Sequence, residues 1–253
     1  MSLWADLEDR SSGDVIRKED RMIVTSDSDN LKEEENAVKG LLNDELHREL
    51  CRCLSIDPND KNAGIGNYVV LSNGQKSYYD FFSARGKKDD IDSDVSKEIQ
   101  AIYVLGEYYL AEYYLGQQNV FNDHNIILYI DCIKKTAIEE NAPGINGKPP
   151  FFTVIRYVYL HELMHAFFHT KKGYKYSREQ EEGLAEFGAL FLLSELVGKK
   201  MASQEELDWA VRHVESKKGA LECYARGAYL FKLFGHDKDL SRRMLEAYPK
   251  LIE

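Results

Sequence analysis

Hydrophobic residues recur at helical spacing through the second half of the chain. Apolar side chains at steps of three and four residues predict five helices there. The predicted helices cover residues 150–170, 178–197, 204–217, 220–234 and 238–250. Two expected helix starts carry the capping-box spacing, in which a Ser is followed three residues later by Gln or Glu: Ser177 with Gln180, and Ser203 with Glu206.

The first half of the chain mixes helical and strand patterns. Helical spacing predicts helices over 31–54 and 95–116, whereas residues 125–133 form a short, apolar, β-branched run that predicts a strand. Two further β-rich runs, 68–71 and 78–82, flank an Asn-Gly pair that tolerates positive φ, so a hairpin is expected there. Together these elements predict the α+β class.

Charged residues are distributed unevenly along the chain. The 253 residues have a formal net charge of −10, and residues 1–35 alone carry 11 acidic and 5 basic side chains with little apolar periodicity. We therefore expect residues 1–35 to form an acidic, flexible extension and residues 36–253 to form one folded domain. A hydrophobic content of 43% is too high for a disordered chain.

Composition also excludes several kinds of partner. An acidic chain is poorly suited to binding a nucleic-acid backbone, which needs clustered Lys and Arg. No apolar run reaches the 18 residues of a membrane span, and the N-terminus lacks a signal-peptide pattern. Four cysteines, three of them in apolar segments, predict buried thiols rather than disulfides, although Cys51-x-Cys53 is a weak metal-binding pattern. The expected location is cytoplasmic.

The candidate chemistry lies in the predicted helix 150–170, which contains the pattern His161-Glu162-Leu-Met-His165. On a helix, residues four apart share a face and are separated by about 6 Å along the axis. Two imidazoles in that arrangement can bind one Zn²⁺, with Glu162 beside them as a base. Chance alone gives such a pattern in ~2% of chains of this composition, so further ligands must be found.

A third ligand is needed because catalytic zinc sites use three protein ligands and leave one position open. His169 lies four residues after His165, but about 12 Å along the axis from His161. The three histidines therefore cannot share one ion. A rival pair of His165 with His169 would leave Glu162 without a role, so His169 is assigned a supporting position near the metal or at the rim of its cleft.

The next predicted helix offers carboxylates instead. Its acidic residues are Glu179, Glu181, Glu182 and Glu186. The first two suit the helix N-terminus, where the macrodipole favours acids. Glu182 and Glu186 share a face with two alanines, which would let the helices approach closely. Spacing alone leaves Glu181 and Glu182 as alternatives.

The two helices together resemble a known family. The run His161–His169, followed by Glu182–Ala189, is similar to the gluzincin zinc metallopeptidases and more narrowly to the ImmA/IrrE-like family. That family carries a helix reading roughly HELGHxxxH and a following helix reading ExxANxFA. The resemblance covers about residues 150–193. It implies a zincin-like fold with a small β-sheet, an active-site helix and a mostly helical C-terminal half.

The resemblance also implies the roles of the residues. His161, His165 and Glu182 would bind Zn²⁺, and Glu162 would be the general base of a metal-activated water that hydrolyses peptide bonds. Glu186 would orient a ligand histidine from outside the metal shell, in place of the family's Asn or Asp. Met164 stands where the family has Gly. The strand 125–133 would bind an extended peptide at the edge of the sheet.

The expected function is therefore zinc-dependent cleavage of a protein or peptide, in particular limited cleavage of a regulatory protein. The alternative is a metal-binding regulatory protein of the same fold without peptidase activity, and hydrolysis of a non-peptide substrate is a third, weaker possibility. A group that stabilises the oxyanion is also expected. The candidates are Tyr174, Tyr176, His213, Tyr224 and Arg226.

Overall fold

The structure is a computed structural model that describes residues 22–26, 28–56, 68–73, 106–110, 124–169, 178–217 and 222–247. It combines helices and strands. The chain divides into two compact units. The first comprises residues up to Cys51 together with Ile56–Cys132, and the second comprises Arg52–Ser55 together with Ile133–Glu253. Each unit is described separately below.

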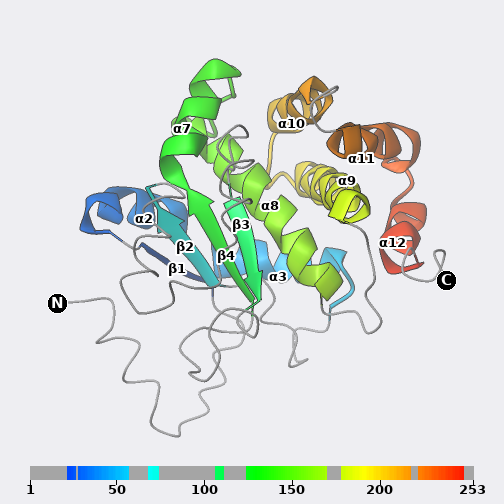
Figure 1. Cartoon of the computed structure of the whole chain (residues 1–253), viewed down its shortest axis with the longest axis horizontal. Helices are drawn as coiled ribbons and strands as arrows, with labels where there is room; N and C mark the ends of the chain where they lie inside the picture. The colour runs from blue at the N-terminus through cyan, green and yellow to red at the C-terminus, as the bar shows by residue number, and fades with distance from the viewer. Residues whose placement is uncertain are drawn as a thin grey trace, which may run out of the picture. The chain divides into compact units, whose positions relative to one another are not determined.

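The first unit is built on a four-stranded mixed sheet with the order β1-β2-β4-β3 (Figure 1). Its strands are β1 (Ile23–Ser26), β2 (Tyr68–Ser72), β3 (Gly106–Leu110) and β4 (His124–Tyr129). The first three in spatial order run parallel, and β3 pairs antiparallel with β4. The side chains of β2 and of residues 126–129 of β4 are buried, as expected for central strands covered on both faces.

The expected hairpin over residues 68–82 is wrong. Residues 68–71 of β2 pair with β1 on one side and with β4 on the other, both in parallel register. A strand has only two edges, so no edge of β2 remains for a strand following Asn73-Gly74. Residues 74–82 lie outside the described residues. The Asn-Gly signal depends only on neighbouring residues. It therefore carries no information about the pairing of β2 with β1 and β4, which lie far from it in the sequence.

Two other expectations for this unit need correction. Within the predicted helix 95–116, residues 106–110 form strand β3, which pairs with β4. This segment is rich in Tyr, which favours strands, so its helical spacing was a weak guide. The predicted strand 125–133 exists as β4, but it ends at Tyr129 and helix α7 (Ile130–Glu139) follows directly. β4 lies between β2 and β3, so it offers no edge to a peptide.

Helices η1 (Asp29–Leu31), α2 (Lys32–Lys39) and α3 (Asp44–Cys53) replace the single helix expected over 31–54. Strand β1 and the first residues of α2 lie inside the segment 1–35 that composition set apart as an extension. The buried carboxylate of Glu35 accepts a hydrogen bond from Ser26 of β1 at 2.6 Å and pairs with Lys32 and Lys39. The boundary drawn from composition at residue 35 thus cuts through packed structure, while residues 1–21 lie outside the described residues.

The second unit is helical, and its helices confirm the pattern read from the sequence. They are α8 (Phe151–His169), α9 (Arg178–Gly198), α10 (Gln204–Ser216), α11 (Glu222–Phe234) and α12 (Lys238–Ala247). The predicted capping box of α10 is present, with Ser203 and Glu206 each bonding the backbone of the other. Ser177 lies outside the described residues. Helix α9 contacts α8, α10, α11 and α12, so it is the central element of this unit.

Two glycines let α11 pack closely on α9. A Cβ on Gly227 of α11 would overlap Glu186 and the backbone of α9, and a Cβ on Gly183 of α9 would lie 2.9 Å from the carbonyl oxygen of Cys223. Only glycine fits at both positions. This close approach brings the first turn of α11 beside the residues of α9 that carry the candidate chemistry.

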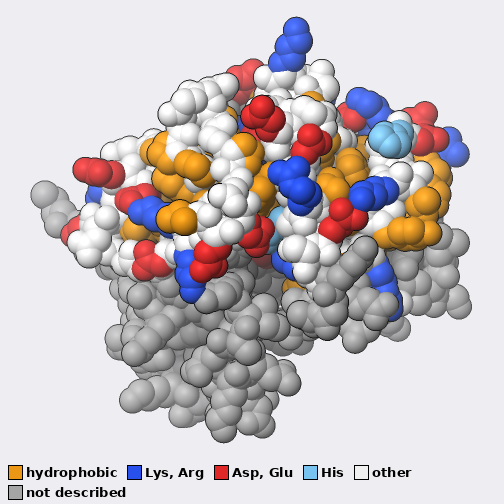
Figure 2. Space-filling model, turned by 90° about the horizontal axis from the view of Figure 1, so that it is seen from above, with side chains coloured by type: hydrophobic (Ala, Val, Ile, Leu, Met, Phe, Trp, Pro, Cys, Tyr) orange, Lys and Arg blue, Asp and Glu red, His pale blue; other side chains and the backbone are white. Residues whose placement is uncertain are grey.

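The described surface is mixed in character. Acidic, basic and hydrophobic side chains are interspersed on the face shown in Figure 2, so the net charge is not gathered into one acidic patch there. No helix of the described residues combines the length and apolarity needed to cross a membrane. The four cysteines form no disulfide. Cys51 and Cys53 are buried, as composition predicted, whereas Cys132 and Cys223 are half-buried.

Candidate metal centre

The two histidines of the predicted motif lie on one face of α8, one turn apart. Their Nε2 atoms are 3.1 Å from each other. Each side chain belongs to a residue that is 9% exposed, because α8 is surrounded by packed side chains along almost its whole length. The helical spacing therefore delivers what the sequence predicted, which is two convergent imidazoles in a largely buried site.

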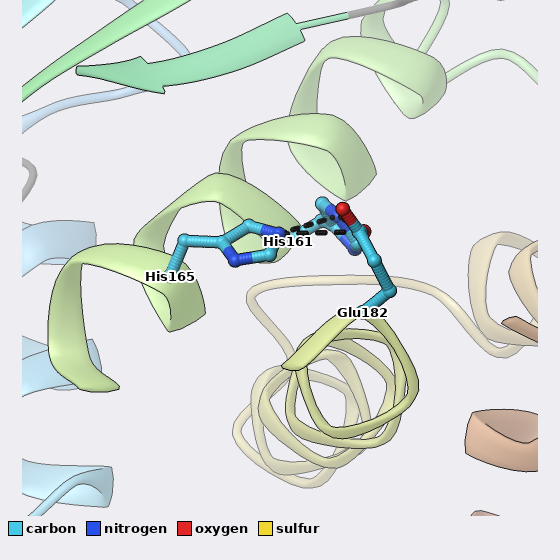
Figure 3. A group of neighbouring side chains, drawn as sticks. All are labelled: His161, His165 and Glu182. Carbon is cyan, nitrogen blue, oxygen red and sulfur yellow. Dashed lines mark hydrogen bonds and ion pairs between the residues drawn. The ribbon is translucent and has the colours of Figure 1, made fainter. Parts of the chain in front are cut away.

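Glu182, near the start of α9, supplies the third group (Figure 3). Its Oε2 atom is 3.3 Å from Nε2 of His161 and 3.5 Å from Nε2 of His165. In Figure 3 the carboxylate reaches from α9 toward both imidazoles on α8. Among the described residues, no fourth His, Cys, Asp or Glu joins this group. We call His161, His165 and Glu182 the ligand cluster.

The spacing of the three atoms fits a tetrahedral metal ion. Zinc binds imidazole nitrogen and carboxylate oxygen at 2.0–2.2 Å in tetrahedral geometry, so its ligand atoms lie roughly 3.3 Å apart. The three observed separations are 3.1, 3.3 and 3.5 Å. Two imidazoles and one carboxylate, with a fourth position that no described residue fills, form a donor set of catalytic zinc sites.

One of the three converging atoms has no hydrogen-bond partner. Oε2 of Glu182 is buried and makes no hydrogen bond. An unpaired buried carboxylate oxygen is costly, and a metal ion at the centre would remove that cost. A positive charge at the point where the three atoms converge would therefore stabilise this carboxylate.

Charge effects on the histidines lead to the same conclusion. Burial lowers the pKa of His161 to about 4, which leaves its lone pair free for a metal at neutral pH. Burial alone would lower the pKa of His165 as well, but Glu181 and Glu182 raise it to about 10. The imidazoles in turn hold the pKa of Glu182 well below its usual range, against the effect of burial. The carboxylates thus favour a cation between them.

Glu181 has a different role from the one left open by spacing. Its Oε1 atom is 2.7 Å from Nδ1 of His165, on the side of the ring away from Glu182. A hydrogen bond donated by Nδ1 fixes the tautomer that leaves Nε2 as an acceptor for metal. Rotation about the α9 axis therefore separates two neighbouring carboxylates, one facing the metal position and one facing the back of a ligand.

Glu186 lies behind the other histidine, although Nδ1 of His161 has no hydrogen-bond partner. Its Oε2 atom is 3.5 Å from Nδ1 of His161 and accepts a hydrogen bond from the hydroxyl of Tyr157. Its Oε1 atom is 3.4 Å from the ammonium of Lys217. Glu186 is 1% exposed, and burial raises its pKa while Lys217 lowers it. Tyr157 and Lys217 complete the surroundings of this carboxylate.

Sequence reasoning did not single out Tyr157 or Lys217. Tyr157 precedes His161 by four residues on α8, so helical spacing could have placed it on the same face. Lys217 follows the last turn of α10, and nothing local connects it with residues of α9. Its position could be known only once α9 and α10 were packed together.

Glu162, the expected base, is buried at the same site. Its negative charge contributes to the raised pKa of His165 and to that of Tyr224. Glu162 therefore lies near the ligand cluster and near Tyr224. It is not a member of the ligand cluster. A carboxylate beside the ligands, but not among them, is suited to moving protons there.

Of the candidate oxyanion donors, the structure brings Tyr224 to the cluster. Its ring stacks on that of His161, with centroids 6.2 Å apart and planes inclined by 13°. Arg226 is exposed, and His213 contacts Glu140 through Nδ1 at 2.5 Å, with its ring centroid 5.5 Å from that of Tyr157. Tyr174, Tyr176 and the side chains of His169 and Glu179 lie outside the described residues.

Met164, which departs from the family's Gly, fits because its neighbour is small. A Cβ on Gly188 of α9 would lie 2.6–2.8 Å from three side-chain atoms of Met164. In the pattern ExxANxFA, counted from Glu182, Gly188 stands at the position of Phe. The large residue on α8 thus faces a glycine on α9, and the space between the two helices stays filled.

Comparisons with known proteins gave no match. No family model matches the chain, and neither a curated protein nor a solved structure matches it.

Proposed function

We propose that the chain is a zinc-dependent hydrolase of the gluzincin type that cleaves peptide bonds in a protein or peptide. The observation that carries the proposal is the convergence of three ligand atoms at separations of 3.1–3.5 Å, with a fourth position free of protein ligands among the described residues. Glu162 beside the cluster distinguishes this arrangement from a purely structural site, which has no use for a base.

The residues of the chain divide the chemistry between them. His161, His165 and Glu182 would hold the zinc ion, which lowers the pKa of a bound water to about 7 and polarises a carbonyl. Glu162 would accept the proton of the attacking water and then pass it to the leaving nitrogen. Glu181 would fix the ring of His165 through Nδ1, whereas the carboxylate of Glu186 would act on His161 from 3.5 Å without a hydrogen bond.

The zincin-like fold and the ImmA/IrrE-like family are part of this proposal. They are supported by the pairing of an HExxH helix with a following helix that contributes Glu182. The exchange of sizes between Met164 and Gly188 removes one objection to membership, because it preserves the packing of the two helices. Limited cleavage of a regulatory protein is the mode of action that the resemblance favours.

The decisive experiment compares wild type with Glu162→Gln and with Glu205→Gln, a control that changes an exposed Glu in the same way. Zinc content of dialysed protein and cleavage of a quenched-fluorescent peptide library are measured. We expect Glu162→Gln to keep its zinc and to lose ~10²–10⁴-fold in rate, the usual contribution of a general base.

The control should match wild type in both measurements. Zinc retention together with equal rates for wild type and Glu162→Gln would overturn the assigned base. Zinc retention without cleavage by any of the three proteins would favour the non-enzymatic alternative, a metal-binding regulatory protein.

A further inference from the structure

The two imidazoles of the ligand cluster are held in different ways. Nδ1 of His165 lies 2.7 Å from Oε1 of Glu181, and a hydrogen bond there fixes the ring. Nδ1 of His161 has no hydrogen-bond partner, although Oε2 of Glu186 lies 3.5 Å away. A hydrogen bond at Nδ1 therefore does not orient the ring of His161, and the groups packed around that ring take over this role.

Two side chains border the ring of His161. The carboxylate of Glu186 lies at its Nδ1 edge, and the ring of Tyr224 stacks on its face, with centroids 6.2 Å apart and planes inclined by 13°. Glu186 belongs to α9 and Tyr224 to α11, whereas His161 belongs to α8. The direction in which the imidazole points thus depends on how two other helices place these side chains.

Lys217, the residue at which α10 ends, contacts both of these side chains. Its Nζ atom is 3.4 Å from Oε1 of Glu186 and 4.7 Å from the centroid of the Tyr224 ring. A cation beside a buried carboxylate offsets the cost of burying that charge, and a cation over an aromatic face is attracted by the ring quadrupole. One ammonium group therefore holds two groups from different helices beside the same histidine.

We propose that Lys217 is a positioning residue of the metal site, which orients the imidazole of His161 by holding Glu186 at its edge and Tyr224 on its face. This inference rests on the proposed metal site. A ligand ring that is already oriented has less freedom to lose when the ion binds, so its affinity for the metal is higher. Lys217 would act in this way without touching the ion.

The test compares metal-free wild type with Lys217→Met, Lys217→Arg and Lys232→Met. Zinc affinity is measured by competition with a chromophoric chelator, and proton–nitrogen correlation spectra record the imidazole nitrogens before metal is added. Met removes the charge and keeps a long side chain, whereas Arg keeps the charge. Lys232 pairs with Glu215 at a more exposed position, so its substitution controls for the loss of an ion-paired lysine.

For Lys217→Met we expect zinc affinity to fall by ~10–100-fold, the usual effect of losing a group that supports a metal ligand. The imidazole signals of His161 should shift in the metal-free protein, while those of His165, which keeps Glu181, should stay in place. Lys217→Arg should recover most of the lost affinity. Lys232→Met should match wild type in both measurements.

Tyr224→Leu removes the ring through which part of this effect passes. The loss of zinc affinity caused by Lys217→Met should therefore be smaller in a Tyr224→Leu background than in wild type, because the two residues are coupled. Equal losses in both backgrounds would contradict the proposed route.

The inference is overturned if Lys217→Met keeps wild-type zinc affinity, or if its affinity falls while the signals of His161 do not move. Should Lys217→Met not fold, Lys217→Gln takes its place under the same criteria. Failure of wild type itself to bind Zn²⁺ would instead overturn the proposed function, so the two failures are distinguishable.

Discussion

Helix α8 contributes to two buried polar groups, an ion pair and the ligand cluster, which differ in how their carboxylates are partnered. Arg156 meets Glu206 of α10, with Nη1 and Oε1 2.6 Å apart and both side chains almost fully buried. About one and a half turns later, His161 begins the ligand cluster with His165 and Glu182. Both groups join α8 to another helix through a buried carboxylate.

The carboxylates differ in how fully they are satisfied. In Glu206, one oxygen binds Arg156 and the other accepts a hydrogen bond from the backbone nitrogen of Ser203 at 2.8 Å. In Glu182, Oε2 makes no hydrogen bond and faces two imidazole nitrogens. The first carboxylate has the opposite charge it needs within the chain. The second faces two imidazoles and draws a positive charge to this position, which a proton on His165 or a bound metal ion would supply.

This difference separates a structural from a functional polar group on a single helix. A buried ion pair fixes how helices pack, and removal of one partner costs stability. A buried cluster of converging ligand atoms is suited instead to hold an ion, as proposed above. The predictions below test whether the two groups separate in this way.

The largest effect is expected from Glu182→Gln, which keeps the size of the side chain and removes its charge. Zinc affinity, measured by chelator competition, should fall by more than ~100-fold, beyond the usual effect of losing a partner outside the metal shell. The free energy of unfolding in urea with a chelator present should fall by less than the loss of about 3–5 kcal/mol expected for a broken buried ion pair, because Glu181 still pairs with His165 at 2.7 Å.

A stability loss in the metal-free protein as large as that of the ion pair would break the comparison, since the ligand cluster would then be structural. Retained zinc affinity would remove Glu182 from the ligand set.

Arg156→Met should lower stability and leave zinc affinity unchanged, which is the reverse of the result expected for Glu182→Gln. Leaving Glu206 buried without its cation should lower the free energy of unfolding by about 3–5 kcal/mol, measured by urea denaturation. Zinc affinity of the folded fraction should equal that of wild type. The matched control is Lys232→Met, which breaks a more exposed ion pair with Glu215 and should cost no more than about 1 kcal/mol.

Arg156→Met combined with Glu206→Gln should recover part of the loss, because Gln removes the uncompensated charge and still completes the capping box. No recovery in the double variant would contradict the assignment of the cost to an unpaired charge.

Gly188→Ala tests whether the packing beside the cluster depends on Met164. In the wild-type background the new methyl group should overpack against Met164 and lower the free energy of unfolding by about 1–3 kcal/mol. The higher helix propensity of Ala should offset about 1 kcal/mol of that loss. In a Met164→Ala background the same change should be neutral or stabilising. Urea denaturation of the four proteins in this cycle gives the coupling energy. Equal effects in both backgrounds would show that the two residues are not coupled.

The smallest effect is expected from Ser203→Ala, which removes one half of the capping box of α10. Thermal and urea unfolding should show a loss of about 1 kcal/mol, while Ser203→Gly should lose only a few tenths. Zinc affinity should be unchanged in both. A change in zinc affinity would mean that the α10 start and the ligand cluster are coupled, contrary to the separation proposed above.

Local patterns predicted the helical unit well. The five helices over 150–250, the capping box of Ser203 and Glu206, and the shared face of His161 and His165 were all readable in advance. Each depends on residues within about one turn or one helix of each other. The first unit was predicted less well, because strand order and pairing depend on partners far apart in the chain.

The sequence by itself determined which side chains could form a metal site, since helical geometry places His161 and His165 together and puts a carboxylate-rich turn at the start of the next helix. Only the tertiary structure decided which carboxylate faces the metal position and which lies behind an imidazole. The physical reason is that Glu181 and Glu182 differ by about 100° around α9, and the rotation of α9 against α8 is set by packing between the helices, including Met164 against Gly188.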